Sequence, residues 1–211
     1  MARDLNAKCK QCRREGVKLF IKGERCNSSK CAMVKRNYIP GIHGIKLGRG
    51  GRLTGYGIQL REKQKAKRMY RILEKQFRNY FDKAIHKTGE TGDNLFNLLE
   101  TRLDNVIYKA GFGNSRDAAR QLISHYHFLV NGKKVNIPSF QVKVKDKITV
   151  KPKSQKMQEF IALPEKLKNF EAPEWLSIDA KEMQITMIDE PNLEKSTPGF
   201  DLKLIIEFYS K

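Results

Sequence analysis

Apolar residues recur at spacings of three and four between residues 58 and 85, a pattern typical of one amphipathic helix. Gly89, just beyond, is a typical helix terminator. The apolar stripe comprises Ala66, Met69, Tyr70, Leu73, Phe77, Tyr80, Phe81 and Ala84. The other faces are basic, and only Glu62 opposes five lysines and arginines within residues 61–68. We predict a helix whose stripe packs into a core and whose basic face contacts phosphates, the alternative being a merely solvated face.

Two more helical patterns precede a run of strands. Residues 94–110 carry an apolar face, and Ser115 is a favourable N-cap for a short helix to about Ser124. The pair Asn131-Gly132 between two apolar runs is the strongest short signal for a β-hairpin. Residues 142–150 then alternate as strands around a turn. This order predicts a helix–helix–antiparallel-sheet module, in which Arg116 and Arg120 project from the polar side of the short helix.

The C-terminal residues 151–211 are divided by prolines and read less clearly. We expect residues 182–187 to form a strand and Trp175 and Leu176 to anchor to a core. Residues 202–208 fit either a strand or a short helix by pattern alone. The acidic surface of this part is a candidate protein-facing side, with a solvated face as the equal alternative.

Residues 36–57 contain seven glycines and four basic side chains, so neither a helix nor a strand is expected there. Such a segment lets backbone N–H groups and arginines approach phosphates, and we predict a strap that orders on RNA; a flexible linker is the alternative. With the helix that follows, the strap supplies the first set of candidate RNA-binding residues. These are Arg36, Lys46, Arg49, Arg52, Tyr56, Arg61, Lys63, Lys65 and Arg68.

The charge distribution points to a polyanion. The chain carries 42 lysines and arginines against 23 acidic residues, a net charge of +19, where a magnitude of about 2 to 8 is ordinary for a small domain. The excess is confined to residues 1–150. Because lysine and arginine displace the counterions of phosphates, we expect a nucleic acid as partner. No apolar run reaches membrane-span length and no signal-peptide pattern opens the chain, so we expect a cytoplasmic protein with no membrane or small-molecule partner.

The cysteines form two short chelating pairs, Cys9-x2-Cys12 and Cys26-x4-Cys31. Two such pairs can complete one tetrahedral four-sulfur site, and the surrounding segment has too few apolar residues to fold unaided. Reducing conditions disfavour the alternative of two disulfides. We predict one structural zinc ion, with an iron–sulfur cluster as the alternative.

The second half of the chain resembles a known RNA-binding module. The matching residues are Arg102-Leu103-Asp104-Asn105, Ser115-Arg116, Ala119-Arg120-Gln121, His125, Val130-Asn131-Gly132-Lys133, Pro138-Ser139 and Asp146-Lys147-Ile148. They closely resemble the small module named after ribosomal protein number four of the bacterial small subunit. Residues 59–65, 76–77, 173–176 and 207–211 extend the resemblance to that ribosomal protein family over nearly the whole chain. The four-cysteine head is similar to the metal-binding subset of the family.

The resemblance implies a structural constituent of the small ribosomal subunit that binds a multi-helix junction in the 5′ domain of 16S ribosomal RNA and nucleates assembly of the subunit body. It also implies contact with small-subunit ribosomal protein number five, a place beside the messenger RNA entry channel and an influence on decoding accuracy. At the C-terminus it implies a short helix packed on residues 58–100. Within the module it implies a second set of RNA-binding residues. These are Arg102, Asn105, Arg116, Arg120, His125, Asn131, Lys133 and Lys134.

These patterns together predict an α+β protein in three parts. Residues 1–45 would form a metal-stapled basic head, and residues 46–100, completed by about 195–211, a small helical domain. Residues 101–194 would form the inserted RNA-binding module with its C-terminal extension, the core of the module being 101–154.

Two other functions deserve comparison. The same module occurs in pseudouridine synthases, and Arg102-Leu103-Asp104 looks like the triplet that carries the nucleophilic aspartate in one branch of them. Asp104, however, falls inside a predicted helix, and we expect no catalytic domain, because no further stretch of about 150 residues is left to form one. A zinc-dependent nucleic-acid-binding regulator would need a recognition helix near the cysteines and a dimer interface, and neither pattern is visible. We therefore predict a binding protein and not an enzyme.

Overall fold

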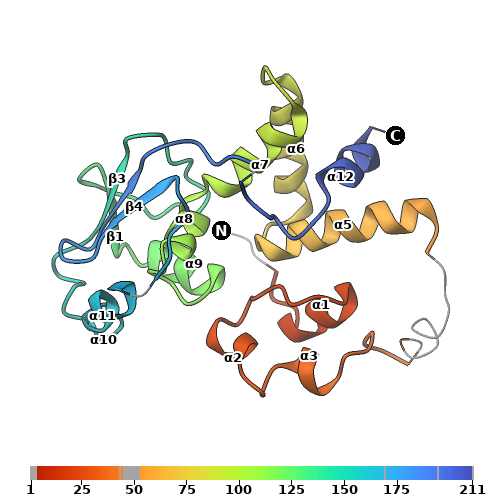
Figure 1. Ribbon diagram of the computed structural model, residues 1–211, viewed down its shortest axis with the longest axis horizontal. Coiled ribbons are helices and arrows are strands. Elements are labelled where there is room, and N and C mark those ends of the chain that lie inside the picture. The colour runs from red at the N-terminus through yellow and green to blue at the C-terminus, as the bar shows by residue number, and fades with distance from the viewer. Residues whose placement is uncertain (1–3, 43, 45–52, 169, 194, 211) are drawn as a thin grey trace. The chain divides into compact units, whose positions relative to one another are not determined.

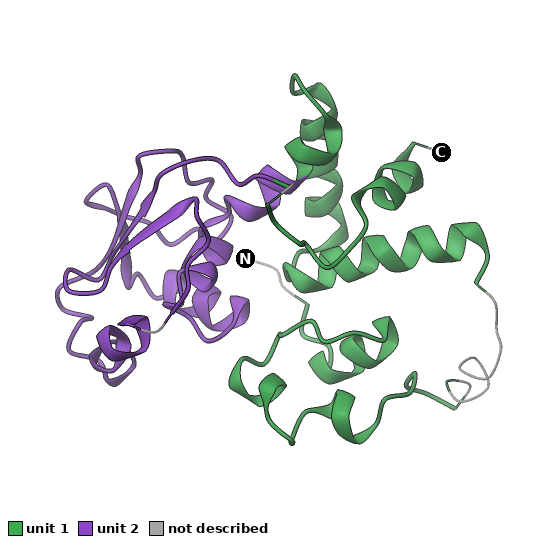
Figure 2. Ribbon diagram, in the orientation of Figure 1, with its two compact units in different colours: residues 1–95, 193–211 green, residues 96–192 purple. Residues whose placement is uncertain are grey.

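The computed structural model describes residues 4–42, 44, 53–168, 170–193 and 195–210. It confirms a mixed architecture of helices and one antiparallel sheet (Figure 1). The chain divides into two compact units, residues 1–95 with 193–211 and residues 96–192 (Figure 2). The cysteine-containing segment belongs to the first unit, and the predicted division into three parts stays a prediction.

The first unit is helical. Its helices are α1 (Lys8–Glu15), α2 (Glu24–Asn27), α3 (Ala32–Lys35), α5 (Gly55–Met69), α6 (Glu74–His86) and α12 (Leu202–Tyr209), and α7 (Thr91–Glu100) leads into the second unit. A small core of Leu19, Ile21, Met33, Cys12 and Cys31 lies beneath α1 and α3. Helix α1 contacts α5, so the cysteine-containing segment packs against the basic helix.

The C-terminal residues 202–208 form a helix, which resolves the ambiguity of their pattern. Asp201 caps α12 by accepting hydrogen bonds from the N–H groups of Lys203 (2.8 Å) and Leu204 (3.4 Å). The helix packs along α5, and the ring of Tyr209 stacks on that of Phe81 of α6 with centroids 4.6 Å apart. The packing implied by the family resemblance is therefore confirmed.

The long helix predicted over residues 58–85 is wrong, because the chain turns between α5 and α6. Arg71 adopts a left-handed backbone conformation (φ 57°) at the break. Its buried guanidinium donates to Gln11 Oε1 (3.0 Å) and to the carbonyl oxygen of Asp4 (2.5 Å). These contacts with the N-terminal segment compensate a conformation that is costly for a residue with a side chain.

The second unit combines helices with an antiparallel sheet. Its strands are β1 (Phe128–Val130), β2 (Lys133–Lys134), β3 (Lys147–Val150), β4 (Leu176–Asp179) and β5 (Gln184–Met187). Its further helices are α8 (Leu103–Lys109), α9 (Arg116–Ser124), α10 (Gln158–Ile161) and α11 (Leu163–Lys168). In the described chain the strand order is β2-β1-β3-β5-β4. One core joins α8 and α9 to the sheet and includes Trp175 and Leu176, as predicted.

Two features predicted from a few neighbouring residues of this unit are confirmed. Ser115 caps α9 by accepting from the N–H of Ala118 (3.2 Å), and Asn131-Gly132 turns the β1–β2 hairpin with both φ angles positive, as a type I′ turn requires. The single helix expected over 94–110 is instead two, α7 and α8, because the chain bends at Thr101 and Arg102 to bridge Gln141. The strand β4 was not predicted.

Candidate nucleic-acid interface

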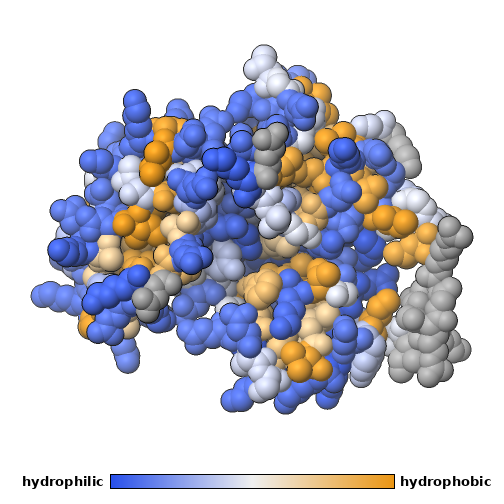
Figure 3. Space-filling view, viewed as in Figure 1, coloured by the Kyte–Doolittle hydropathy of each residue, from blue (hydrophilic) through white to orange (hydrophobic). Residues whose placement is uncertain are grey.

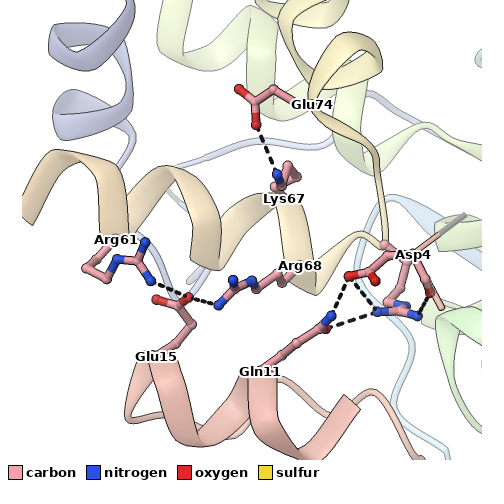
Figure 4. Close-up of polar contacts among 8 residues, drawn as sticks. Asp4, Gln11, Glu15, Arg61, Lys67, Arg68 and Glu74 are labelled. Carbon is pink, nitrogen blue, oxygen red and sulfur yellow. Dashed lines mark hydrogen bonds and ion pairs between the residues drawn. The ribbon is translucent and has the colours of Figure 1, made fainter. Parts of the chain in front are cut away.

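Two arginines of α5 converge on one carboxylate of α1. Arg61 Nη1 lies 3.3 Å from Glu15 Oε1, and Arg68 Nη1 contacts the same oxygen (Figure 4). The side chain of Glu15 is 1% exposed, whereas each arginine is 23% exposed. Burial raises the pKa of Glu15, and the nearby Arg61 and Arg68 act against that rise. The carboxylate therefore fixes two cations that still reach the surface.

The other basic residues of α5 are held by carboxylates in the same way. Lys65 Nζ pairs with Glu62 Oε1 at 2.7 Å. Lys63 is buried, pairs with Glu74 Oε1 at 2.7 Å and lies over the ring of Phe208 (4.4 Å to the centroid). The prediction that Lys63 belongs to a phosphate-facing surface is therefore wrong, because α6 and α12 cover it.

Glu74 gathers three donors. Besides Lys63, it accepts from Lys67 Nζ (3.0 Å) and the hydroxyl of Tyr209 (2.8 Å). Burial alone would raise the pKa of Glu74, but these hydrogen bonds outweigh it and lower the pKa to about 2. Burial and the same hydrogen bond raise the pKa of Tyr209. Glu74, at the start of α6, therefore links the basic helix α5 to the C-terminal helix α12.

Four residues assigned to RNA by the resemblance form an internal polar network of the second unit. Arg102 donates to both carboxylate oxygens of Asp104, from Nε at 3.0 Å and from Nη2 at 2.6 Å. Asn105 Nδ2 donates to Glu100 Oε2 (2.9 Å). The remaining contacts are Arg116 Nε to Asn105 Oδ1 (2.8 Å) and Arg120 Nη1 to Asp104 Oδ2 (3.6 Å).

The expectation that Arg116 and Arg120 project from the module is wrong, since they are only 9% and 4% exposed. Arg102 and Asn105 are 0% exposed and present no surface to RNA in this structure. The reason is that Asp104 and Asn105 lie on α8 where it contacts α9, and their oxygens draw both α9 arginines inward. These residues hold α8 and α9 together, and their role in RNA binding stays a prediction.

The remaining assigned residues of the module are exposed. Asn131, Lys133 and Lys134 lie on the hairpin, where Asn131 Nδ2 donates to Asp146 Oδ1 (2.8 Å). His125 follows α9, and its ring centroid lies 6.1 Å from that of His127. Both histidines line a cavity of about 340 Å³ beside α9 and α10.

In the first unit, Arg36 and Tyr56 are exposed, and Tyr56 packs on Phe208 with centroids 5.6 Å apart. The predicted contacts Lys46, Arg49 and Arg52 lie outside the described residues. In Figure 3, hydrophilic side chains are spread over the drawn face of each unit, with patches of hydrophobic side chains between them. No helix within the described ranges is both long and apolar enough to cross a membrane.

The four cysteines line one small cavity of about 20 Å³ together with Ile21 and Met33. All four are free thiols, and burial, with the other three thiols nearby, raises the pKa of Cys12. Four sulfurs around one cavity are a donor set that suits a tetrahedral ion. Among the residues with described positions, however, no three thiol, imidazole or carboxylate side chains are close enough to hold a metal as they stand.

The carboxylates that organise the basic side chains were missed by sequence reasoning. Glu15 and Arg61 are 46 positions apart, as the printed sequence shows, and Glu74 meets Tyr209 from 135 positions away. No local pattern connects such pairs, so only the folded chain shows that these acidic residues hold the cations of α5 in place.

Comparison with known proteins identifies the family of the chain. Residues 3–100 match the family model described as ribosomal protein S4/S9 N-terminal domain, and residues 101–148 match the S4 domain. A protein of Syntrophomonas wolfei named small ribosomal subunit protein uS4 is 51% identical over the full length of both chains. Proteins of the same name from Nitrosospira multiformis and Clostridium beijerinckii are 50% identical, also over both full lengths. The chain therefore belongs to the family of small ribosomal subunit protein uS4.

Proposed function

We propose that this protein is a structural constituent of the small ribosomal subunit and binds 16S ribosomal RNA. The observation that carries the proposal is the match of about half of all residues, from end to end, with proteins named for that subunit. The net charge of +19, concentrated in residues 1–150, supports a polyanionic partner. In this role the protein acts in the cytoplasm, within the subunit.

The arrangement of the basic side chains suits recognition of phosphates and shape. Glu15 holds Arg68 closely and Arg61 by a longer contact, and Glu62 holds Lys65, so these cations are already gathered at the surface before RNA binds. The exposed Lys133 and Lys134 lie on a hairpin whose turn is braced by Asn131. Phosphate contacts of this kind orient a protein on folded RNA and carry little sequence information themselves.

The finer assignments are proposals that rest on the family resemblance. They place the RNA contact at a multi-helix junction of the 5′ domain and give the protein an early role in assembly. They add ribosomal protein number five as a neighbour and messenger RNA at the entry channel, with an influence on accuracy. The acidic C-terminal part, with nine basic against eleven acidic residues in 151–211, is the surface that suits a protein partner.

We further propose that Cys9, Cys12, Cys26 and Cys31 hold one structural zinc ion, an iron–sulfur cluster being the alternative. A bound ion would crosslink a segment whose own apolar core is small. Lys22 already donates its N–H to Cys26 Sγ (3.3 Å), a contact that helps to stabilise a thiolate. Four protein ligands leave no open position for a substrate, so the role would be structural.

An enzymatic function of the pseudouridine synthase type fits the site poorly. The side chain of Asp104 is 3% exposed and paired with Arg102. Its carboxylate therefore cannot reach an RNA base to act as the nucleophile. A zinc-dependent regulator of DNA remains the second alternative, and a preference of the protein for RNA over DNA would separate the two readings.

Association with the subunit in cells tests the proposal. A tagged full-length chain should sediment with small subunits and complete ribosomes, and should remain bound after a wash at moderately high salt. A chain that stays in the light fractions, or that leaves the subunit at low salt, would contradict it.

A further inference from the structure

A cavity of about 410 Å³ lies beside Glu15 in the first unit. Its charged lining consists of Arg14, Glu15, Arg61, Glu62 and Lys65. We call this cavity the Glu15 pocket. Three cations face two carboxylates there, and Arg68 adds a fourth positive charge on Glu15 from outside the lining. The rest of the lining is Gly16 and the apolar side chains of Ile39, Leu53 and Ile58. The pocket therefore joins a net positive charge to an apolar wall, which suits a phosphate group together with the sugar that carries it.

The two carboxylate oxygens of Glu15 differ in their hydrogen bonding. Its Oε1 accepts from both Arg61 and Arg68. Its Oε2 is buried and has no hydrogen-bond partner among the described residues. In Figure 4 this second oxygen lies on the side of Arg61 and away from Arg68. Because a buried carboxylate oxygen without a donor is costly, the site calls for a ligand that supplies one donor beside an anion.

Of the two arginines that contact Glu15, Arg61 is the one better placed to leave the carboxylate and contact a bound anion. Its contact with Oε1 is 3.3 Å, longer than the contact made by Arg68, and the side chain is 23% exposed. Burial lowers the pKa of Arg61, and the positive charges of Arg14 and Arg68 lower it further, while Glu15 opposes both effects. An anion in the pocket relieves this repulsion. If Arg61 turns to that anion, the carboxylate of Glu15 becomes open to a new donor.

We propose that the Glu15 pocket binds one ribonucleotide of the RNA backbone, with its phosphate on Arg14, Arg61 and Lys65 and a ribose 2′-hydroxyl donating to Glu15. A ribose hydroxyl and the adjacent phosphate are the donor and the anion that the pocket lacks, joined in one unit. DNA has no such hydroxyl, so the pocket would distinguish RNA from DNA. This inference rests on the proposed function, since it names how the protein recognises its RNA.

Interference mapping with a 16S 5′-domain RNA fragment tests the hydroxyl directly. The fragment carries 2′-deoxynucleotides at random positions, and RNA that still binds the full-length protein is compared with the starting pool. With the wild-type protein we expect a few positions at which the 2′-deoxy substitution weakens binding. With Glu15→Gln, whose amide nitrogen cannot accept at the position of Oε2, one of these positions should become insensitive and affinity should fall about tenfold.

The exposed Glu182 provides the charge-matched control, and Glu182→Gln should keep the wild-type map and affinity. An unchanged map for Glu15→Gln would overturn the inference. Should Glu15→Gln fail to fold, Arg14→Gln tests the phosphate half. It should reduce the slope of log affinity against log salt by about one. An unchanged slope would overturn the inference.

Failure of the proposed function gives a different result. In that case the wild-type protein would bind the 16S fragment no better than a folded RNA of equal length, and no position of the map would stand out. A clear preference of the wild-type protein, combined with identical maps for wild type and Glu15→Gln, would leave the function in place and refute only the role of Glu15.

Discussion

Replacing Asp104 by alanine should destabilise the second unit by about 3 to 5 kcal/mol, the usual cost of removing one partner of a buried ion pair. Asp104 accepts two hydrogen bonds from Arg102, at 3.0 and 2.6 Å, and lies 3.6 Å from Arg120. Arg102 is 0% exposed, so its charge cannot turn to water when the carboxylate is gone. The two hydrogen bonds alone, each made between charged groups, account for about 1.5 to 3 kcal/mol apiece.

Trp175 makes the measurement specific to one unit. It is the single tryptophan of the chain and is buried in the core of the second unit. Urea denaturation of the full chain, followed by its fluorescence, should show the midpoint falling for Asp104→Ala. The same assay on Glu182→Ala, which removes an exposed carboxylate in that unit, should change stability by less than about 0.5 kcal/mol.

A loss below about 1 kcal/mol for Asp104→Ala would refute the reasoning, because it would show that Arg102 finds solvent or another partner. The double variant Arg102→Met with Asp104→Leu provides a second check. Since it removes both charges together, it should cost clearly less than the sum of the single changes.

Three further outcomes are expected. Glu74→Gln should cost about 1 kcal/mol near neutral pH, an amount discounted for the 44% exposure of the side chain. Because the folded pKa of Glu74 is about 2 against an ordinary 4.5, this contribution is complete above pH 4.5 and fades as the pH falls towards 2; a gap between thermal unfolding curves that is independent of pH would contradict it. Cys9→Ser with Cys12→Ser should abolish bound zinc in elemental analysis and expose residues 4–42 to protease, while the Trp175 transition persists; loss of that transition would show that the units do not fold separately. Asp201→Ala should weaken α12 by about 1 kcal/mol and speed its amide hydrogen exchange, and unchanged exchange would deny the cap its role.

Features set by neighbouring residues could be predicted from the sequence. The cap at Ser115 and the Asn131-Gly132 turn depend on a few adjacent positions, and both form as expected. The chain breaks at Arg71 and at Arg102 could not be read in the same way, because neither glycine nor proline marks them. Each break is stabilised by distant partners, the segment at Asp4 for Arg71 and the strand-like contact with Gln141 for Arg102.

In the candidate interface, too, some features follow from the sequence and others depend on distant partners. Its positive charge and the general position of the basic helix follow from composition and periodicity. Which cations face solvent does not, because carboxylates from other elements decide it. Glu74 draws Lys63 inward, and Asp104 draws Arg120 inward, whereas Glu15 holds Arg61 where it still reaches the surface. Amphipathic patterns place a long basic side chain on a polar face, but its partner determines whether the charged end lies outside.

The most direct test of the central claim is the affinity of the full-length protein for a 16S ribosomal RNA 5′-domain fragment, measured across salt against a folded RNA of equal length. Specific recognition predicts a large preference for the 16S fragment that persists as salt rises, because shape and hydroxyl contacts survive when counterion release weakens. Equal affinity for the two RNAs, lost together as salt rises, would contradict the account and would leave the charge of +19 acting as a general attraction for polyanions.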